Sequence, residues 1–401
     1  MGSLQQAIRA VENAALAQDN GEEGAHGRLL DAIDNLTSLT STPTDMVARI
    51  RRQAMPLAIL RIVIEMGLLD ALNETPDKAV TTEALGQKTE INELLILRLM
   101  RCIAGIGAVD EVGENTFAAN QATRYVLQPG STAALRFQHD IFYGMFNALV
   151  PYLQKHQTIH QFPEKSGEET VFQYAFGNTF FEYIKSNQAW KRNFDNFMSY
   201  RHSSTTWYET YPVEKELEID NLKQDPQSVL LVDVAGGSGH DALTFRERFP
   251  GLPGRCILED LPETLQRVDQ IERPGIELVP YDFYTPQPIK GARVYFFRRI
   301  LHDWSDDQCR KFLVNTVAAM DAGYSRILIE DRILPSSGVN LSTALADVNI
   351  MMVAAGIERT ETQFRQLLHS VGLEVVKVWY SSGSVIEGVI EARRRGPSKH
   401  D

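Results

Sequence analysis

The residue best suited to acid–base chemistry is His302, in the stretch Tyr295-Phe-Phe-Arg-Arg-Ile-Leu-His302-Asp-Trp. The apolar run before it predicts a buried strand, and the imidazole that follows is the side chain that titrates nearest to neutral pH. In open α/β sheets, ligands bind at the carboxyl ends of the strands. A histidine at such a place is by default a structural residue, so its role depends on its neighbours.

Two acids follow where later loops return to the same sheet edge. Asp331 comes directly after the predicted strand ending at Glu330, and Glu358 stands in Ala355-Gly-Ile-Glu-Arg-Thr360. A base oriented by carboxylates can remove a proton from a hydroxyl group, and a phenol, with a pKa of about 10, suits such a base. His302, Asp331 and Glu358 are therefore candidates for an acid–base site.

The acids that follow His302 could also indicate a metal site. However, Ser305 and Gln308 have the spacing of a helix capping box. Asp306 and Asp307 are then first-turn acids that interact favourably with the helix dipole. No spacing typical of metal ligands appears, and we predict no metal.

A nucleotide-binding turn is predicted at residues 229–241, VLLVDVAGGSGHD. The apolar start indicates a buried parallel strand that Asp233 closes. Gly236, Gly237 and Gly239 let the backbone turn sharply and approach a ligand before a helix begins. The N–H groups at the start of that helix face the same point.

The next strand ends at Glu259-Asp260, and an acid at this place commonly holds ribose hydroxyls, which makes Asp260 the ribose candidate. The segment 237–242 fits the dinucleotide pattern G-x-G-x-x-A, so glycine spacing alone leaves an NAD enzyme open. Asp233 favours S-adenosylmethionine, because the ammonium group of that cofactor needs an anion or a carbonyl nearby. A glycine-rich turn without a ligand is the third alternative, disfavoured by the ordered succession of strand, glycines, helix and second acid.

Short apolar strands alternate with helical segments from residue 229 onward, which is typical of an α/β fold with a doubly wound sheet. The predicted strands are 229–232, 256–258, 276–279, 294–297, 327–329, 373–378 and 385–391. The last two lie close together in the sequence, so we expect an antiparallel hairpin at the sheet edge.

The first part of the chain is predicted to be helical, with one hairpin. The elements are helices at 3–18, 27–39, 44–72, 81–85 and 92–106, and a hairpin at 109–117. Three helices followed by a hairpin is the order of a winged helix. The helix at 44–72, with Pro56 near its start, carries more apolar surface than one core-facing stripe requires, which indicates burial against another chain or helical layer.

Residues 131–210 are helical and rich in aromatic side chains, most of which are expected in the core. Their density before the nucleotide-binding strand also suggests the walls of an apolar pocket for a flat substrate. Met351 and Met352 could pack on such a ring. The candidate substrate residues are His139, Phe142, Phe176, Phe180, Met351 and Met352.

The composition argues against several classes of protein. The 401 residues include 40 Lys and Arg against 52 Asp and Glu, a formal net charge of −12, which disfavours a nucleic-acid partner. The three cysteines are far apart, no signal peptide is recognisable, and no 18 apolar residues follow one another. We therefore expect a soluble cytoplasmic protein with no membrane partner. Its expected parts are residues 1–125, 126–220 and 221–401.

The chain resembles the S-adenosylmethionine-dependent O-methyltransferases of the plant caffeic-acid type and their fungal counterparts in secondary metabolism. The resemblance covers most of the chain and rests on VDVAGGSG, EDLPETL, YDFY, HDW and GIERT. It implies a Rossmann-like class I methyltransferase domain and a homodimer formed through the helical, winged-helix N-terminal domain. It also implies His302 as general base, flanked by Asp331 and Glu358. The implied cofactor contacts are Asp233, Gly236, Gly237, Gly239, Asp260, Leu261, Asp282, Phe283 and Arg298.

Three positions depart from the family pattern. Ala235 stands where the family often has glycine, which should narrow the loop slightly. Arg298 replaces the lysine of plant members and keeps the charge with a different geometry. Asp331 stands where many members have glutamate, so its contact with His302 should be weaker.

The implied reaction is in-line displacement at the sulfonium methyl by an acceptor hydroxyl, with an aromatic polyketide or related phenol as acceptor. Some fungal relatives keep the cofactor but catalyse pericyclic cyclisations, for which His139, Arg201 and Arg299 could polarise a carbonyl. The presence of His302 argues against that alternative. A regulatory winged-helix protein that senses the cofactor is a further alternative, but the helix at 92–106 carries only two arginines.

Overall fold

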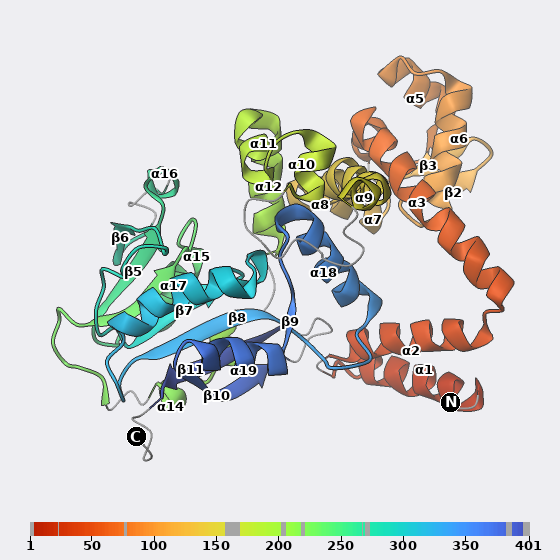
Figure 1. Ribbon diagram of the computed structural model, residues 1–401. Coiled ribbons are helices and arrows are strands. Elements are labelled where there is room, and N and C mark those ends of the chain that lie inside the picture. The colour runs from red at the N-terminus through yellow and green to blue at the C-terminus, as the bar shows by residue number, and fades with distance from the viewer. Residues whose placement is uncertain are drawn as a thin grey trace. The chain divides into compact units, whose positions relative to one another are not determined.

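The computed structural model describes residues 4–22, 24–75, 78–156, 169–201, 206–217, 221–266, 268, 273–381 and 387–395. They form two compact units, one of Met1–Lys155 and Gln173–Ser204, the other of His156–Phe172 and Thr205–Asp401. Each unit is described by itself, and their elements are labelled in Figure 1. The three-part division of the chain remains a prediction. The first two residues of the strand expected at 385–391, and the side chain of Arg201, lie outside the described residues.

The second unit is built on a mixed sheet with the order β10-β11-β8-β7-β4-β5-β6. Its parallel strands are β4 (Val229–Val234), β5 (Arg255–Asp260), β6 (Ile276–Pro280), β7 (Val294–Arg298) and β8 (Arg326–Leu334). The antiparallel strands are β10 (Leu373–Tyr380) and β11 (Glu387–Arg394), and the short β9 (Arg359–Thr360) pairs with the end of β8. The doubly wound sheet and the antiparallel pair at its edge are confirmed.

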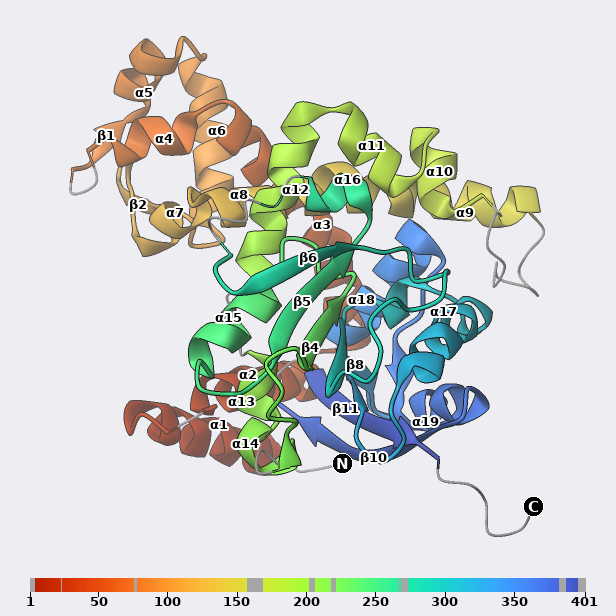
Figure 2. The same cartoon turned by 90° about the vertical axis from the view of Figure 1, so that its left-hand side faces the viewer.

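Both faces of this sheet are covered by helices, as Figure 2 shows. Alternate side chains of the strands point to opposite faces. One face packs against α17 (Asp306–Ala319) and α19 (Glu361–Ser370), and the other against α13 (Trp207–Thr210) and α15 (His240–Arg248). Such two-sided burial explains why the first four residues of β4, 229–232, are all apolar.

Three further helical elements of the second unit are short or stand near the strand ends. They are α14 (Val213–Glu216), α16 (Pro262–Leu265) and α18 (Leu341–Ala354). A 3₁₀ turn, Leu301–Asp303, follows β7 directly. The carboxyl ends of β7 and β8 and the start of β9 therefore meet at one edge of the sheet.

The first unit is helical apart from a small three-stranded sheet. Its helices are α1 (Leu4–Asp19), α2 (Ala25–Thr40), α3 (Pro43–Glu65), α4 (Leu68–Asn73), α5 (Thr82–Thr89), α6 (Glu93–Ala104), α7 (Gln121–Val126), α8 (Pro129–Arg136), α9 (Tyr143–His156), α10 (Val171–Phe176), α11 (Phe180–Ser186) and α12 (Gln188–Arg201). The last residue of α9 and the first two of α10 fall in the second unit. A π-helical turn, Phe137–Phe142, joins α8 to α9. The sheet has the order β1-β3-β2, from β1 (Val80–Thr81), β2 (Asp110–Gly113) and β3 (Thr116–Ala118).

The prediction of a single helix at 44–72 was wrong. The helix α3 ends at Glu65, because Gly67 adopts a left-handed conformation (φ 66°) that separates α3 from α4. Pro56 lies inside α3 rather than near its start. The surplus apolar surface is real, since Met46, Val47, Ile50 and Met55 are exposed in the single chain. None of the helices in the described parts of the chain is long and apolar enough to cross a membrane.

Candidate active site

His302 lies in the 3₁₀ turn after β7, and only 7% of the residue is exposed. Its Nδ1 lies 3.1 Å from Glu358 Oε1 and 3.6 Å from Asp331 Oδ1. Its Nε2 lies 3.5 Å from Asp303 Oδ1. The structure therefore brings together the three residues that the sequence singled out for acid–base chemistry. The hydrogen bond of Nδ1 with Glu358 favours the tautomer with the proton on Nδ1, because an ionised carboxylate only accepts hydrogen bonds, and this leaves Nε2 as the basic nitrogen.

Three elements deliver these side chains to one point. Asp331 lies on β8, and Glu358 directly precedes β9, whose backbone pairs with the end of β8. The N–H of Ile357 donates to the carbonyl of His302 at 2.8 Å. The N–H of Glu358 donates to Asp347 on α18, also at 2.8 Å. The loop before β9 is thus bonded to the histidine turn on one side and to α18 on the other.

Gly356 allows this loop to approach the histidine turn. A Cβ atom at residue 356 would overlap the carbonyl oxygen of His302. The preceding Ala355 ends α18 in a left-handed conformation with φ 54°. A non-glycine residue in that conformation is strained, and such strain is often found at functional sites.

The carboxylates act on the histidine through charge. Burial alone would lower the pKa of His302, but the charges of Asp331, Asp303 and Glu358 and the hydrogen bond with Glu358 raise it above its ordinary value of 6.5. Burial raises the pKa of Asp331, and the charge of His302 offsets this only in part. Burial would also raise the pKa of Glu358, yet the bond with His302 and the charge of Arg332 lower it. Glu358 is therefore held in its ionised form beside the histidine.

Two arginines that were not predicted for the acid–base site also belong to it. Arg332 Nη1 lies 3.1 Å from Glu358 Oε1, the oxygen that also faces His302. Arg299 Nη1 lies 4.0 Å from Asp331 Oδ1, and its other terminal nitrogen bonds Glu387. The only sequence signal for them is their position beside the motif residues at the ends of β7 and β8.

The same three side chains have a spacing that could hold a metal ion, because one ligand atom from each lies within 4.8 Å of the others. However, Arg332 and Arg299 each bring a positive charge to one of the carboxylates. A histidine shared between the two acids accounts for the geometry without a further cation. The metal-free interpretation remains a prediction.

The glycine turn after β4 has the form expected of a nucleotide site. Gly237 and Gly239 adopt left-handed conformations (φ 61° and 73°), and α15 begins directly after Gly239. A Cβ atom at Gly236 would overlap the carboxylate of Asp233, so the backbone lies directly over that side chain. Asp233 is 1% exposed, and its Oδ2 has no hydrogen-bond partner among the described residues.

An acid with an unpartnered oxygen below a glycine turn fits a cofactor that carries an ammonium group. Burial, and after it the charge of Asp241, raises the pKa of Asp233 well above its ordinary range. A cation bound nearby would stabilise the ionised form. Asp260 accepts hydrogen bonds from the N–H of Gly237 at 2.8 Å and of Leu261 at 2.7 Å, which holds the ends of β4 and β5 together. These residues fit the predicted cofactor.

Arg298 lies in a buried ion network. Its Nη1 contacts both oxygens of Asp241, at 2.7 and 3.0 Å, and its Nε lies 2.7 Å from Glu330 Oε2. Neither acid was singled out from the sequence, although Asp241 belongs to the glycine motif. Arg298 therefore offsets the negative charge that gathers beneath the turn.

The two other predicted cofactor residues follow β6. Asp282 is exposed and accepts the N–H of Tyr284 at 3.0 Å. Phe283 packs against Phe312 and Trp304, with ring centroids 4.6 and 5.8 Å apart. Their contact with the cofactor remains a prediction.

The candidate substrate residues divide between the two units. His139 and Phe142 lie in the π-helical turn, where His139 Nδ1 contacts Asp140 Oδ1 at 2.6 Å. The ring of Phe176 packs against Gly144, and Phe180 packs against Phe137 in a cluster of rings. In the other unit, α18 carries Met351, which is partly buried, and Met352, which is fully buried. Packing explains Phe180 and Met352, and all six remain predictions as substrate residues.

Comparisons with known proteins identify a related family. Residues 157–374 match the O-methyltransferase domain family. The O-methyltransferase asqD of Emericella nidulans is 34% identical over 338 residues, which cover 83% of this chain and 85% of asqD.

Solved structures show the same fold. A structure described as a pericyclic reaction enzyme has a TM-score of 0.85 and 28% identity, covering 98% of this chain and 100% of that one. LepI in complex with S-adenosylmethionine has a TM-score of 0.85 and 29% identity, with the same coverage. OxaC in complex with sinefungin and meleagrin has a TM-score of 0.80 and 29% identity, covering 98% and 99%.

The chain therefore belongs to the family of S-adenosylmethionine-dependent O-methyltransferases. Its second unit is a class I methyltransferase domain, and S-adenosylmethionine is its cofactor.

Proposed function

We propose that the enzyme transfers the methyl group of S-adenosylmethionine to a hydroxyl group of a small aromatic secondary metabolite, with His302 as general base. The acceptor is a phenol, such as that of an aromatic polyketide. The observation that carries this proposal is the contact of 3.1 Å between His302 Nδ1 and Glu358, which leaves Nε2 as the proton acceptor. Such a base removes the acceptor proton while the oxygen attacks.

The cofactor supplies an activated methyl group on a sulfonium, so alignment of acceptor and donor accounts for most of the acceleration. The chain supplies the base and its support. His302 Nε2 accepts the proton, and the imidazolium that forms is stabilised by Asp331 and Glu358. A positioned base of this kind contributes about 10² to 10⁴-fold to the rate.

The predicted cofactor contacts divide by chemistry. Asp233 would receive the ammonium group, and Asp260 the ribose hydroxyls. The backbone of Gly236, Gly237 and Gly239 would line the turn beside the cofactor. These assignments are supported by the unpartnered oxygen of Asp233 and by the close approach of Gly236.

A second candidate function is pericyclic catalysis with retained cofactor, and the likeness to a pericyclic reaction enzyme favours considering it. In that case His139 and Arg299 would polarise the substrate. Arg299 already pairs with Asp331 and Glu387, which reduces its capacity to do so. The intact contact of His302 with two acids supports methyl transfer.

The test is a mass-spectrometric assay of purified enzyme with S-adenosylmethionine and a panel of phenolic polyketides. Methyl transfer predicts one added methyl group per product and an equal amount of S-adenosylhomocysteine. An isomerised product of unchanged mass, with the cofactor intact, would replace this proposal by the pericyclic one.

We further propose a cytoplasmic homodimer formed through the first unit, whose helical and winged-helix elements would lie at the interface. The exposed apolar side chains of α3, with Leu4 and Leu16 of α1, support this proposal because monomers rarely expose so much apolar surface. Light scattering after gel filtration would give a mass near twice 45.1 kDa. A mass of one chain would contradict it.

A further inference from the structure

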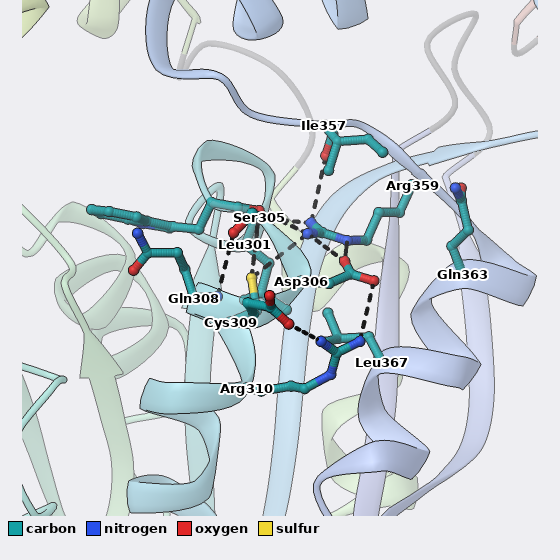
Figure 3. Close-up of polar contacts among 12 residues, drawn as sticks. Leu301, Ser305, Asp306, Gln308, Cys309, Arg310, Ile357, Arg359, Gln363 and Leu367 are labelled. Atoms are coloured by element: carbon teal, nitrogen blue, oxygen red, sulfur yellow. Dashed lines mark hydrogen bonds and ion pairs between the residues drawn. The ribbon is translucent and has the colours of Figure 1, made fainter. Parts of the chain in front are cut away.

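Arg359 is a fully buried arginine that directly follows Glu358 in the chain. A buried guanidinium is costly unless its donors are satisfied. Its surroundings, drawn in Figure 3, combine one carboxylate with several backbone carbonyls. Two of those carbonyls, of Leu301 and Trp304, belong to a segment more than 50 residues earlier in the sequence.

The guanidinium bonds both ends of the turn that carries His302. Its Nη1 donates to the carbonyl of Leu301 and its Nη2 to the carbonyl of Trp304, each at 2.7 Å. Its Nε donates to Asp306 Oδ1 at 2.8 Å, at the start of α17. The donors thus bond to carbonyls on either side of His302 and to the helix that follows.

The backbone of Arg359 is fixed at the same time. It pairs with Ile333 in the parallel contact between β9 and β8, two residues beyond Asp331 on the same strand. One residue therefore ties together the histidine turn, the strand of Asp331 and the loop of Glu358. The donor set is planar and rigid, which a lysine could not reproduce because its ammonium is a point charge on a flexible stem.

We propose that Arg359 is the positioning residue that holds the His302 turn against Glu358, and so sets the geometry of the base. Arg359 is fully buried and bonds the histidine turn, Asp306 and the loop of Glu358, so it acts through these groups. This inference rests on the proposed function, because its catalytic consequence requires that His302 be the base. Its structural part, the placement of His302 beside Glu358, can be measured without turnover.

Arg293 provides a matched control. It is 1% exposed and likewise donates to backbone carbonyls, those of Leu217 at 3.1 Å and Tyr324 at 2.6 Å. It directly precedes β7, whereas the His302 turn follows the end of that strand. Burial and carbonyl bonding are therefore common to both arginines, and only Arg359 bonds the histidine turn.

The experiment compares Arg359→Lys with Arg293→Lys in the full-length enzyme. Both variants should lose a similar amount of thermal stability. Arg359→Lys should lower kcat by about 10 to 100-fold, because small displacements of a catalytic group have effects of that size. Its acceptor KM and cofactor affinity should stay within about threefold of wild type, and Arg293→Lys should keep its kcat.

The second readout is the pKa of His302 followed by NMR of the imidazole, with the signal assigned by loss in His302→Gln. The charged groups that face His302 are Asp303, Asp331 and Glu358, with Arg299 and Arg332 behind them. Lysine keeps the charge at position 359, so a fall in the pKa of His302 would report that Glu358 has moved away. Arg293→Lys should leave the titration unchanged.

The positioning role is overturned if Arg359→Lys keeps both kcat and the titration of His302, or if Arg293→Lys loses as much kcat. Should Arg359→Lys fail to fold, Asp306→Asn serves instead, because Asp306 is half exposed and its loss weakens one bond of Arg359. It should give a smaller loss of kcat in the same direction, and full activity would contradict the proposal. If the wild type methylates nothing, the proposed function fails while the titration still tests the placement.

Discussion

Gly356 lies against the carbonyl oxygen of His302, so closely that a Cβ atom at residue 356 would overlap it. The neighbouring N–H of Ile357 donates to the same oxygen at 2.8 Å. The loop that carries Glu358 can therefore reach the histidine only because residue 356 has no side chain. The distance between base and acid depends on this contact.

Gly356→Ala should lower kcat by at least about tenfold, because the methyl group pushes the loop, and Glu358 with it, away from His302. Steady-state kinetics would measure the loss. Gly251→Ala is the control, since an added Cβ there meets nothing within 4 Å. Wild-type kcat in Gly356→Ala would show that the close contact does not set the geometry of the base.

His302→Ala should bind S-adenosylmethionine with wild-type affinity, yet methylate about 10² to 10⁴-fold more slowly. Isothermal titration calorimetry gives the affinity, and product formation gives the rate. As a control, His369→Ala, at an exposed position, should change neither the affinity nor the rate. Near-full turnover of His302→Ala would remove it from the role of base.

The pH dependence of kcat/KM should follow His302. The base works only when neutral, so activity should fall as pH drops through its pKa, which Asp331 and Glu358 hold above 6.5 against the effect of burial. Asp331→Asn removes one of these charges, so its acid limb should move to lower pH. Asp307→Asn, on the exposed side of α17, should leave the limb in place. An acid limb that Asp331→Asn does not move would contradict this coupling.

Stability should depend on pH through Glu259. Burial raises the pKa of this carboxyl to about 7 in the folded chain, against 4.5 for an ordinary glutamate, and only Gln287 partly offsets it. Between these values the unfolded chain releases a proton that the folded chain keeps, so folding stability falls as pH rises from 4.5 to about 7, by roughly 3 kcal/mol.

Glu259→Gln should remove that loss and unfold at a higher temperature than wild type at pH 8, with a smaller difference at pH 5. Glu277→Gln, on the adjacent strand, controls for the change in net charge. Equal unfolding temperatures of wild type and Glu259→Gln across this range would refute the prediction.

Ala235→Gly should stabilise the second unit. Ala235 adopts φ 57°, a conformation that costs an alanine about 1 kcal/mol or more. Glycine avoids this cost, but its greater conformational freedom in the unfolded chain offsets part of the gain in stability. We expect a net gain of about 0.5 kcal/mol in the free energy of unfolding, measured by urea denaturation. Ala318→Gly, on the exposed side of α17, should instead destabilise.

The sequence predicted the parallel strands of the second unit's main sheet because strands buried on both faces are largely apolar runs; the short β9 was missed. It predicted that His302, Asp331 and Glu358 would meet, because each follows a strand or returns to the same sheet edge. The glycine turn could also be predicted, because its strand, acid, glycines and helix follow one another directly in the sequence.

What the sequence could not provide were the long-range partners. Arg359 is adjacent to a motif residue, but its bonds run to carbonyls near residue 302, and backbone carbonyls carry no sequence signal. Arg332 and Asp347 reach Glu358 only because β8 and α18 converge on it. The break after Glu65 was missed because the apolar pattern continues through Gly67 into α4.

The place of β11 in the sheet has a consequence for synthesis on the ribosome. This strand, Glu387–Arg394, is the last along the described chain, yet it lies inside the sheet, between β10 and β8. The strand that bears Asp331 therefore lacks its neighbour until residue 394 has emerged from the exit tunnel. Until then the nascent chain exposes an unpaired strand edge beside Asp331, and such edges promote aggregation.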